Sequence, residues 1–227
     1  MQDWLSYRLS DLILFSPRTY YRMFELYHEA IWPAQLVALG IVVVILVMLR
    51  RDDPWRGVVI AALLAACWLW VGIAFQLRRY ATINWAARYF AVLFVVQAAL
   101  LVWYGLVRRR LTFGRPGRTW VRPAAFVLAV VLPPLAGLAA DRTLEQLELM
   151  GLTPDATSVA TIGLLLVSSP PAPRALMLVP LCWCVIGGAT LSALDSPEAW
   201  GSIGAGLVAL IVMLWRLRPI NGAPIAE

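Results

Sequence analysis

Residues 76–90, QLRRYATINWAARYF, form a polar inset between two long apolar runs. The predicted spans on either side, 57–76 and 85–107, overlap the ends of this inset. Each reaches about the 20 residues that an α-helix needs to cross about 30 Å of hydrocarbon. Two such runs around a short polar connection indicate a polytopic membrane protein. We therefore predict an all-α fold, a bundle of transmembrane helices.

The composition of the whole chain supports this fold class. Of its 227 residues, 61% are hydrophobic and only 14% are charged, with a mean hydropathy of +0.76. This balance excludes a soluble globular domain, because most of the chain needs lipid rather than water as its solvent. At about 20 residues a span, the length allows six or seven spans with their loops. It leaves no room for a second folded domain.

Seven segments are predicted spans of one transmembrane domain, residues 33–218. They are residues 33–49, 57–76, 85–107, 123–140, 156–169, 175–194 and 199–215, and a tail at 219–227 follows them. Segment 156–169 has only 14 residues, about 21 Å of helix. It is either a short span, tilted or in a thinned bilayer, or a re-entrant segment, and the number of spans is accordingly seven or six. Pro133 and Pro134 predict a break and a bend in the fourth span.

Residues 1–32 precede the first span and are predicted to form interfacial helices. The apolar residues of segment 4–13 recur at helical spacing, with charged residues opposite, as in a helix that lies in the membrane plane. Ser16 followed by Pro17 reads as an N-cap and a first helical residue, which opens a second helix. Pro33 predicts a kink where this helix enters the first span.

The arginines predict the orientation of the chain. All 19 basic residues are arginine, the net charge is +6, and on a membrane protein such an excess sets orientation rather than nucleic-acid binding. With seven spans, twelve arginines lie on the side of the C-terminus and six on the other side; the loop 108–122 alone holds six. We expect the N-terminus outside and the C-terminus inside. A re-entrant 156–169 would move one end to the opposite side.

The inset is the first candidate site. Its candidate ligand-binding residues, with one glutamine from the following span, are Arg78, Arg79, Asn84, Trp85, Arg88 and Gln97. Asn84 and Arg88 are four residues apart and would share a helix face, where together they can bind a carboxylate, a phosphate or a quinone carbonyl. The alternative is that the arginines extend to lipid headgroups and anchor the end of the helix.

A second candidate site lies on the helix before the first span, at Glu25, His28 and Glu29. Glu-x-x-His places two metal ligands on one face, as in di-iron carboxylate bundles, but those need two such motifs and two further carboxylates. The chain has a single histidine. A solvated helix face in which Arg22 pairs with Glu25 is the alternative, and no metal site is predicted.

Motifs for catalysis are missing from the sequence. It contains no Walker loop, no nucleophile elbow and no set of zinc ligands, so neither an enzyme of ordinary type nor a cofactor is expected. The three cysteines lie inside apolar runs and suggest no disulfide scaffold. Cys182 and Cys184 are two apart, which is not the spacing of a redox pair.

Four segments resemble an uncharacterised family of bacterial membrane proteins, the domain of unknown function numbered 6064. They are SPRTYYRMFELYHEAIWPAQ from Ser16, QLRRYATINWAARYF from Gln76, GLTPDATSVATIGLLL from Gly151 and PLCWCVIGGATL from Pro180. The first two are the more specific, because polar and aromatic residues alternate in an unusual order. The resemblance implies a protein of the bacterial inner membrane without an assigned activity, and it carries over no catalytic or binding residue.

Two functional classes follow. The first is a small permease, or a membrane protein that binds a solute or lipid, with its polar site at the start of the third span. The second is a non-catalytic accessory or assembly subunit of a larger membrane complex, which would pack against a membrane protein partner. A polar cavity bounded by Asn84, Arg88 and Gln97 would favour the first class. A tightly packed interior with an exposed groove of Gly and Ala would favour the second.

Overall fold

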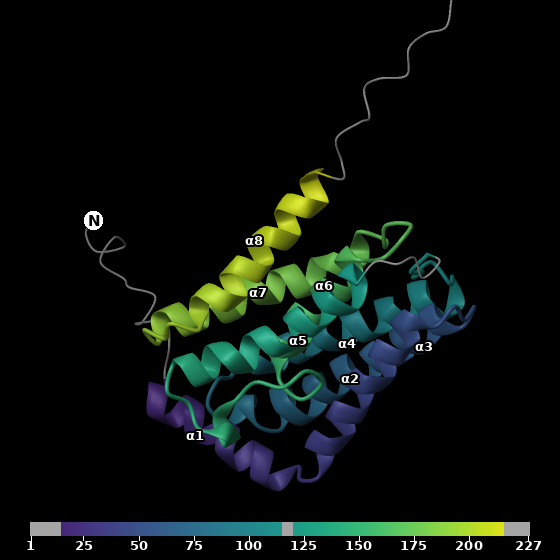
Figure 1. Cartoon of the computed structure of the whole chain (residues 1–227). Helices are drawn as coiled ribbons and strands as arrows, with labels where there is room; N and C mark the ends of the chain where they lie inside the picture. The colour runs from purple at the N-terminus through teal and green to yellow at the C-terminus, as the bar shows by residue number, and fades with distance from the viewer. Residues whose placement is uncertain (1–14, 115–119, 216–227) are drawn as a thin grey trace, which may run out of the picture.

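The computed structural model describes residues 15–114 and 120–215, and these residues are mainly helical (Figure 1). Within them the only pairing of β type is an isolated parallel bridge between Phe113 and Ser169. The interfacial helix predicted within residues 1–14 and the tail 219–227 lie outside the described residues, as do residues 115–119 of the arginine-rich loop.

Eight α-helices follow one another along the described chain. They are α1 (Pro17–Ala30), α2 (Ala34–Arg50), α3 (Arg56–Trp70), α4 (Ala87–Leu101), α5 (Val121–Ala139), α6 (Pro154–Leu166), α7 (Ala175–Ala193) and α8 (Ala199–Trp215). Two π-helical turns extend α3 and α4, namely η2 (Val71–Leu77) and η4 (Val102–Val107). Two short 3-10 turns complete the set, η3 (Tyr80–Thr82) and η5 (Leu144–Gln146). The prediction of an all-helical fold is confirmed.

Helix α1 lies across one end of the bundle, and α2 leaves it at an angle of 86° (Figure 1). Ser16 caps α1 as predicted, since its Oγ accepts a hydrogen bond from the backbone N–H of Thr19 at 3.2 Å and Pro17 occupies the first turn. The bend falls at Pro33, where the chain was predicted to kink. The inward face of α1 is aromatic: Tyr20, Phe24 and Tyr27 are buried against the core.

Helix α5 runs through Pro133 and Pro134 without interruption. The prediction that these prolines break the fourth span is therefore wrong. A proline inside a helix removes one donor and one hydrogen bond, whereas the turns before and after it keep theirs. In α5 those turns are enough to keep the helix continuous.

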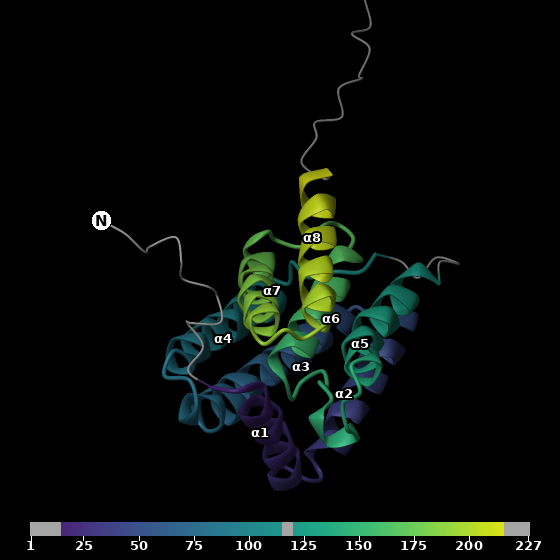
Figure 2. The ribbon, with the colours of Figure 1, turned by 90° about the vertical axis from the view of Figure 1, so that its left-hand side faces the viewer.

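Helix α6 is the centre of the bundle. It packs against α5, α7 and α8, and Figure 2 shows it between α5 on one side and the α7 and α8 pair on the other. All of its 13 residues except Gly163 and Leu166 are buried. Most side chains of α6 therefore contact neighbouring helices and would not be exposed to lipid.

The bundle has two chemically different ends. At the arginine-rich end lie Arg50, Arg51, Arg56, Arg108, Arg109, Arg110, Arg122 and Arg174. There the N–H of Ser169, just after α6, donates to the Thr112 carbonyl at 2.9 Å. At the opposite end, the α1 end, Tyr27 donates to the carbonyl of Leu152, just before α6, at 2.9 Å. Helix α6 therefore connects the two ends of the bundle.

Four helical segments are long and apolar enough to cross a membrane. They are Arg56–Thr82, Ala87–Val107, Val121–Ala139 and Ala175–Ala193. The bent pair α1 and α2 makes a fifth if it counts as one span, and α6 and most of α8 are shorter apolar helices. By length and composition the described residues thus contain four or five candidate spans.

Candidate functional site

A pocket of about 430 Å³ lies between α1 and the inset. We call it the basic pocket, and its lining residues are Arg18, Thr19, Arg22, Met23, Leu26, Arg78, Arg79, Thr82 and Ile83. Two segments more than fifty residues apart in the sequence each contribute two arginines. The pocket is therefore a concentration of positive charge at the α1 end.

The aromatic face of α1 sets the position of the basic pocket. Tyr80 of the inset is buried and packs edge-on against Tyr20, with ring centroids 6.0 Å apart, and against Phe15 at 5.9 Å. Because Arg18 and Arg22 are one helical turn apart, both project from the same side of α1. On the inset, the hydroxyl of Thr82 donates to the Arg79 carbonyl at 2.6 Å and fixes the turn that carries the other two arginines. Packing of apolar rings thus brings four cations together.

Only one of these arginines has an acidic partner in the described chain. Arg22 pairs with Glu25, one turn further along α1, as predicted. Within residues 15–114 and 120–215, no carboxylate lies within 4.0 Å of the guanidinium of Arg18, Arg78 or Arg79. Guanidinium groups hold phosphate and carboxylate oxygens through paired N–H donors. The basic pocket therefore has the charge and the donors to bind an anion.

The other predicted inset residues lie outside the basic pocket. Asn84 precedes α4 rather than lying on it, because its Oδ1 accepts a hydrogen bond from the N–H of Ala86 at 3.0 Å in the turn before the helix. The expectation that Asn84 and Arg88 share a helix face is therefore wrong. Arg88 and Trp85 are exposed, and Trp85 stacks edge-on with Tyr89. Gln97 is fully buried and donates to the Leu176 carbonyl at 2.9 Å, so it ties α4 to α7.

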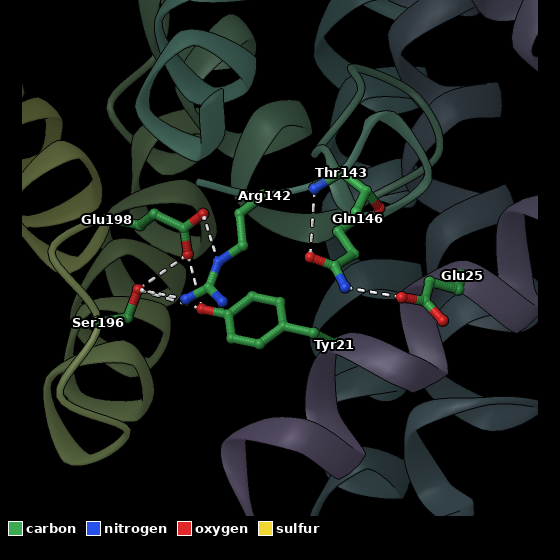
Figure 3. Close-up of polar contacts among 7 residues, drawn as sticks. All are labelled: Tyr21, Glu25, Arg142, Thr143, Gln146, Ser196 and Glu198. Carbon is green, nitrogen blue, oxygen red and sulfur yellow. Dashed lines mark hydrogen bonds and ion pairs between the residues drawn. The ribbon is translucent and has the colours of Figure 1, made fainter. Parts of the chain in front are cut away.

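The side chains of the second predicted group, Glu25, His28 and Glu29, differ in burial and in hydrogen-bond partners. Glu25 accepts a hydrogen bond from Gln146 Nε2 at 2.7 Å (Figure 3). His28 is buried, with its Nδ1 2.8 Å from the Glu145 carbonyl oxygen, and Glu29 is exposed. In the described chain, no three His, Cys, Asp or Glu side chains are grouped closely enough to hold a metal ion. The buried histidine makes this face of α1 a contact with the loop before α6 rather than a solvated surface.

Three carboxylates that share no sequence motif lie together at the α1 end of the bundle. Glu148, Asp155 and Glu198 line a small cavity of about 30 Å³, which we call the carboxylate cavity. Its other lining residues are Leu132, Pro133, Ala136, Val159, Leu191, Gly201 and Ser202. Asp155 is 5% exposed, which is rare for a carboxylate that has no cationic partner.

Each carboxylate has its own hydrogen-bond partners. Asp155 accepts hydrogen bonds from the indole N–H of Trp183 on α7 and from the hydroxyl of Ser202 on α8, the latter at 3.0 Å. Glu148 accepts from the backbone N–H groups of Asp155 and Ala156 at 3.1 and 3.3 Å, so it caps the start of α6. Burial raises the pKa of Glu148 well above its usual value, and the nearby charges of Asp155 and Glu198 raise it further.

Glu198 lies in the turn that joins α7 to α8, and its carboxylate contacts side chains of α1, of this turn and of the loop before α6 (Figure 3). Its Oε2 accepts hydrogen bonds from the Tyr21 hydroxyl at 2.7 Å and from the Ser196 hydroxyl at 2.9 Å. Its Oε1 lies 3.5 Å from Nε of Arg142. The Arg142 guanidinium in turn lies 3.3 Å from the centre of the Tyr21 ring, a cation–π contact. Helix α1 is thus joined by polar contacts to both segments that supply the carboxylates.

A groove of about 660 Å³ runs along α5, α6 and α8, and we call it the apolar groove. Its lining consists of apolar and small residues: Ala125, Leu128, Ala129, Leu132, Ala136, Ala139, Ala140, Val159, Ile162, Gly163, Leu166, Pro197, Trp200, Gly201, Gly204, Ala205 and Val208. Leu132, Ala136, Val159 and Gly201 also line the carboxylate cavity, so the two spaces share walls.

Comparison with known proteins gives the chain a family. The model of a family of unknown function, DUF6064, matches residues 18–222. The chain belongs to this family. No curated protein and no solved structure matches it. The matched range contains every residue that lines the basic pocket, the carboxylate cavity and the apolar groove, so all three are features of the family's domain in this chain.

Proposed function

We propose that this member of the DUF6064 family is a multi-pass membrane protein that binds an anionic lipid or solute in the basic pocket. The observation that carries this proposal is that four arginines from α1 and the inset line one pocket, and only Arg22 has an acidic partner in the described chain. Cations that line one pocket repel one another, and an anion between them lowers that cost. A phosphate or a carboxylate supplies the matching oxygens. The proposed role is non-enzymatic.

The proposed topology has seven crossings, α2 to α8 with the π-helical turns that extend α3 and α4. Support comes from α6, whose two ends contact opposite ends of the bundle, so that it passes through rather than turning back. Its short length is tolerable because neighbouring helices enclose it. The arginine-rich end would then face the cytoplasm and the basic pocket the opposite side of a bacterial inner membrane, with the N-terminus out and the C-terminus in.

Binding of an anionic lipid in the basic pocket is compatible with the alternative role of the inset arginines, which is to anchor the helix end at lipid headgroups. Arginines at this depth extend toward lipid phosphates, and a pocket of four such groups would select an anionic headgroup rather than only touch the membrane surface. A small permease would be the transporting form of the same protein. The carboxylates inside the α1 end of the bundle supply ionisable groups that such a form would need.

Binding can be tested with the full chain purified in a mild non-ionic detergent. We expect native mass spectrometry to show a retained anionic lipid or solute, and Arg78→Ala with Arg79→Ala to remove it. Arg88→Ala is the matched control, because Arg88 is an exposed arginine of the same inset that does not line the pocket. Equal retention by both variants would refute the proposal. Vesicles with and without anionic phospholipid, compared with soluble phosphate, identify the source of the anion.

A second candidate, a non-catalytic accessory subunit, is favoured by a different observation. The apolar groove presents Ala136, Gly163 and Gly204 among many small residues, the lining that lets transmembrane helices approach closely. None of the basic pocket, the carboxylate cavity and the apolar groove is lined by Asn84, Arg88 or Gln97. A stoichiometric protein partner that stays bound after removal of Arg78 and Arg79 would support this candidate.

A further inference from the structure

One part of the apolar groove adjoins the carboxylate cavity. Along α5, α6 and α8 its lining is apolar, whereas Glu148, Asp155, Glu198 and Ser202 lie behind its shared walls. Gly201 forms part of both spaces, and a Cβ added to it would meet only the Cβ of Ala136, at 3.9 Å. Of the four residues that line both spaces, Ala136 and Gly201 are small, and Leu132 and Val159 complete the shared lining.

The carboxylate cavity has more carboxyl groups than cationic partners. Within residues 15–114 and 120–215, Arg142 is the only basic side chain within 4.0 Å of any of the three carboxylates, and it pairs with Glu198. Asp155 receives only the neutral donors of Trp183 and Ser202. A buried carboxylate with neutral donors is costly unless a cation accompanies it. This end of the groove is complementary to one positive charge.

The size of the cavity limits that charge to a small group. A volume of about 30 Å³ accommodates one water-sized group, because one water needs at least about 10–15 Å³ of such space. A primary ammonium has this size and carries three N–H donors, which suit carboxylate oxygens. The three carboxylates are not grouped closely enough to hold a metal ion. The groove, at about 660 Å³, lies within the usual range of about 300–1,000 Å³ for small-molecule sites.

We propose that the apolar groove and the carboxylate cavity together form a binding site for an amphiphile that has a hydrocarbon tail and a primary ammonium head. The tail lies between α5 and α8, against α6, and the ammonium lies among Asp155, Ser202 and Glu198. This site is separate from the basic pocket and takes a ligand of opposite charge. A partner helix with apolar side chains would fill the groove and leave the charge of Asp155 unmatched, which is why the amphiphile is the better occupant.

The test uses hexadecylamine that carries a photoactivatable diazirine in its tail, added to the full chain in non-ionic detergent. We expect cross-links on α5 and α8 near Leu128 and Val208, which line the groove. Unlabelled hexadecylamine should compete at least tenfold better than hexadecanol or palmitic acid. Equal competition by hexadecanol would overturn the assignment of the head group, and cross-links confined to other helices would overturn the site.

Two pairs of variants test the two halves of the site. Asp155→Asn removes the charge and should weaken labelling about tenfold, whereas Glu29→Gln removes an exposed carboxylate elsewhere and should not. Gly204→Leu fills the groove and should abolish labelling. Gly40→Leu is its control, since a Cβ at either glycine meets nothing within 4 Å and Gly40 lies on α2, away from the groove.

Folding and assembly are checked on the same samples. Size-exclusion chromatography shows whether each variant stays folded, and Gly204→Leu keeps the test valid if Asp155→Asn does not fold. Arg78→Ala with Arg79→Ala should leave amine labelling unchanged, because neither arginine lines the groove or the carboxylate cavity. The result for the amine site is therefore independent of whether the basic pocket binds an anion. A wild-type dimer that Gly204→Leu makes monomeric, with no amine labelling, would overturn the proposal and assign the groove to a second copy of the chain.

Discussion

Gly187 of α7 lies directly against the carboxylate of Asp155 on α6, since a Cβ at position 187 would come within 2.5 Å of Oδ1 and 3.0 Å of Oδ2. Trp183, one turn earlier on α7, donates to the same carboxylate, and Ser202 reaches it from α8. Three helices thus meet around one buried charge. Helix α7 can approach this closely only because position 187 has no side chain.

Gly187→Ala should therefore destabilise the protein. The added methyl group must displace the Asp155 carboxylate or separate α6 from α7, a cost of about 1–3 kcal/mol for overpacking in a filled interior. The measurement is the apparent Tm in detergent. Gly204→Ala is the control, since its Cβ meets nothing within 4 Å. It should stay within about 1 kcal/mol of wild type. Equal apparent Tm values for the two variants would contradict this account of position 187.

Tyr21→Phe should loosen α1 from the rest of the bundle. It removes the hydrogen bonds to Glu198 and Ser196, and a bond to a charged group contributes about 1.5–3 kcal/mol. The ring stays, so the contact with the Arg142 guanidinium is kept. Hydrogen exchange of α1 should rise in this variant while that of α4 stays unchanged.

Tyr89→Phe is the matched control for Tyr21→Phe. Tyr89 is 66% exposed, and its ring contact with Trp85 does not depend on the hydroxyl. If Tyr89→Phe loosened α1 as much as Tyr21→Phe does, the contact between Tyr21 and Glu198 would not be what holds α1.

The contribution of Glu148 to the stability of the protein should fall as pH rises above about 4.5. Burial raises the pKa of this carboxyl in the folded state well above the usual 4.5, so the native state keeps its proton to a higher pH than the unfolded state. The native state then binds more protons across that window, and the free energy of unfolding declines until the folded pKa is passed.

Glu148→Gln should make this decline shallower and raise the apparent Tm above that of wild type at the high end of the window. Asp155, Glu198 and Tyr20 also face Glu148 and remain, so the difference between variant and wild type is the quantity to measure. Glu145→Gln, at an exposed position of the same loop, serves as the control. A parallel decline in wild type and Glu148→Gln would mean that other groups cause the pH dependence.

The arginine-rich end should face the cytoplasm. In a variant whose Cys67, Cys182 and Cys184 are replaced by alanine, Asp52→Cys places a thiol on the exposed turn between α2 and α3. Thr82→Cys places one in the exposed part of the inset at the other end. In intact spheroplasts, a membrane-impermeant maleimide should label position 82 but not 52, and permeabilisation should expose both. The reverse pattern would invert the topology.

Some of this structure was readable from local sequence. The apolar composition of segments such as 57–76 makes them candidate membrane spans, because a helix that satisfies its own backbone needs only apolar side chains to be stable in lipid. The start of α1 at Ser16 and Pro17 and the bend at Pro33 follow from backbone chemistry within a few residues. The family was also identifiable from short segments.

Other features depended on neighbours that the sequence does not show. Pro133 and Pro134 predicted a broken helix, but the surrounding turns keep α5 continuous. Asn84 was placed on a helix face, whereas its side chain completes the turn before α4. In the first case the helical turns on either side outweighed the two prolines, and in the second a hydrogen bond from the Ala86 N–H holds the Asn84 side chain in the turn.

The sequence by itself determined that this chain is helical, that several of its segments are apolar enough to cross a membrane, and that one end is rich in arginine, because hydropathy and charge act residue by residue. Only the tertiary structure decided which charges meet. Arg18 and Arg78 are sixty residues apart, and Glu148 and Glu198 fifty. Their proximity follows from the packing of α1 on the inset and of α8 on α6, and such packing depends on side-chain shape across helices rather than on any pattern along one of them.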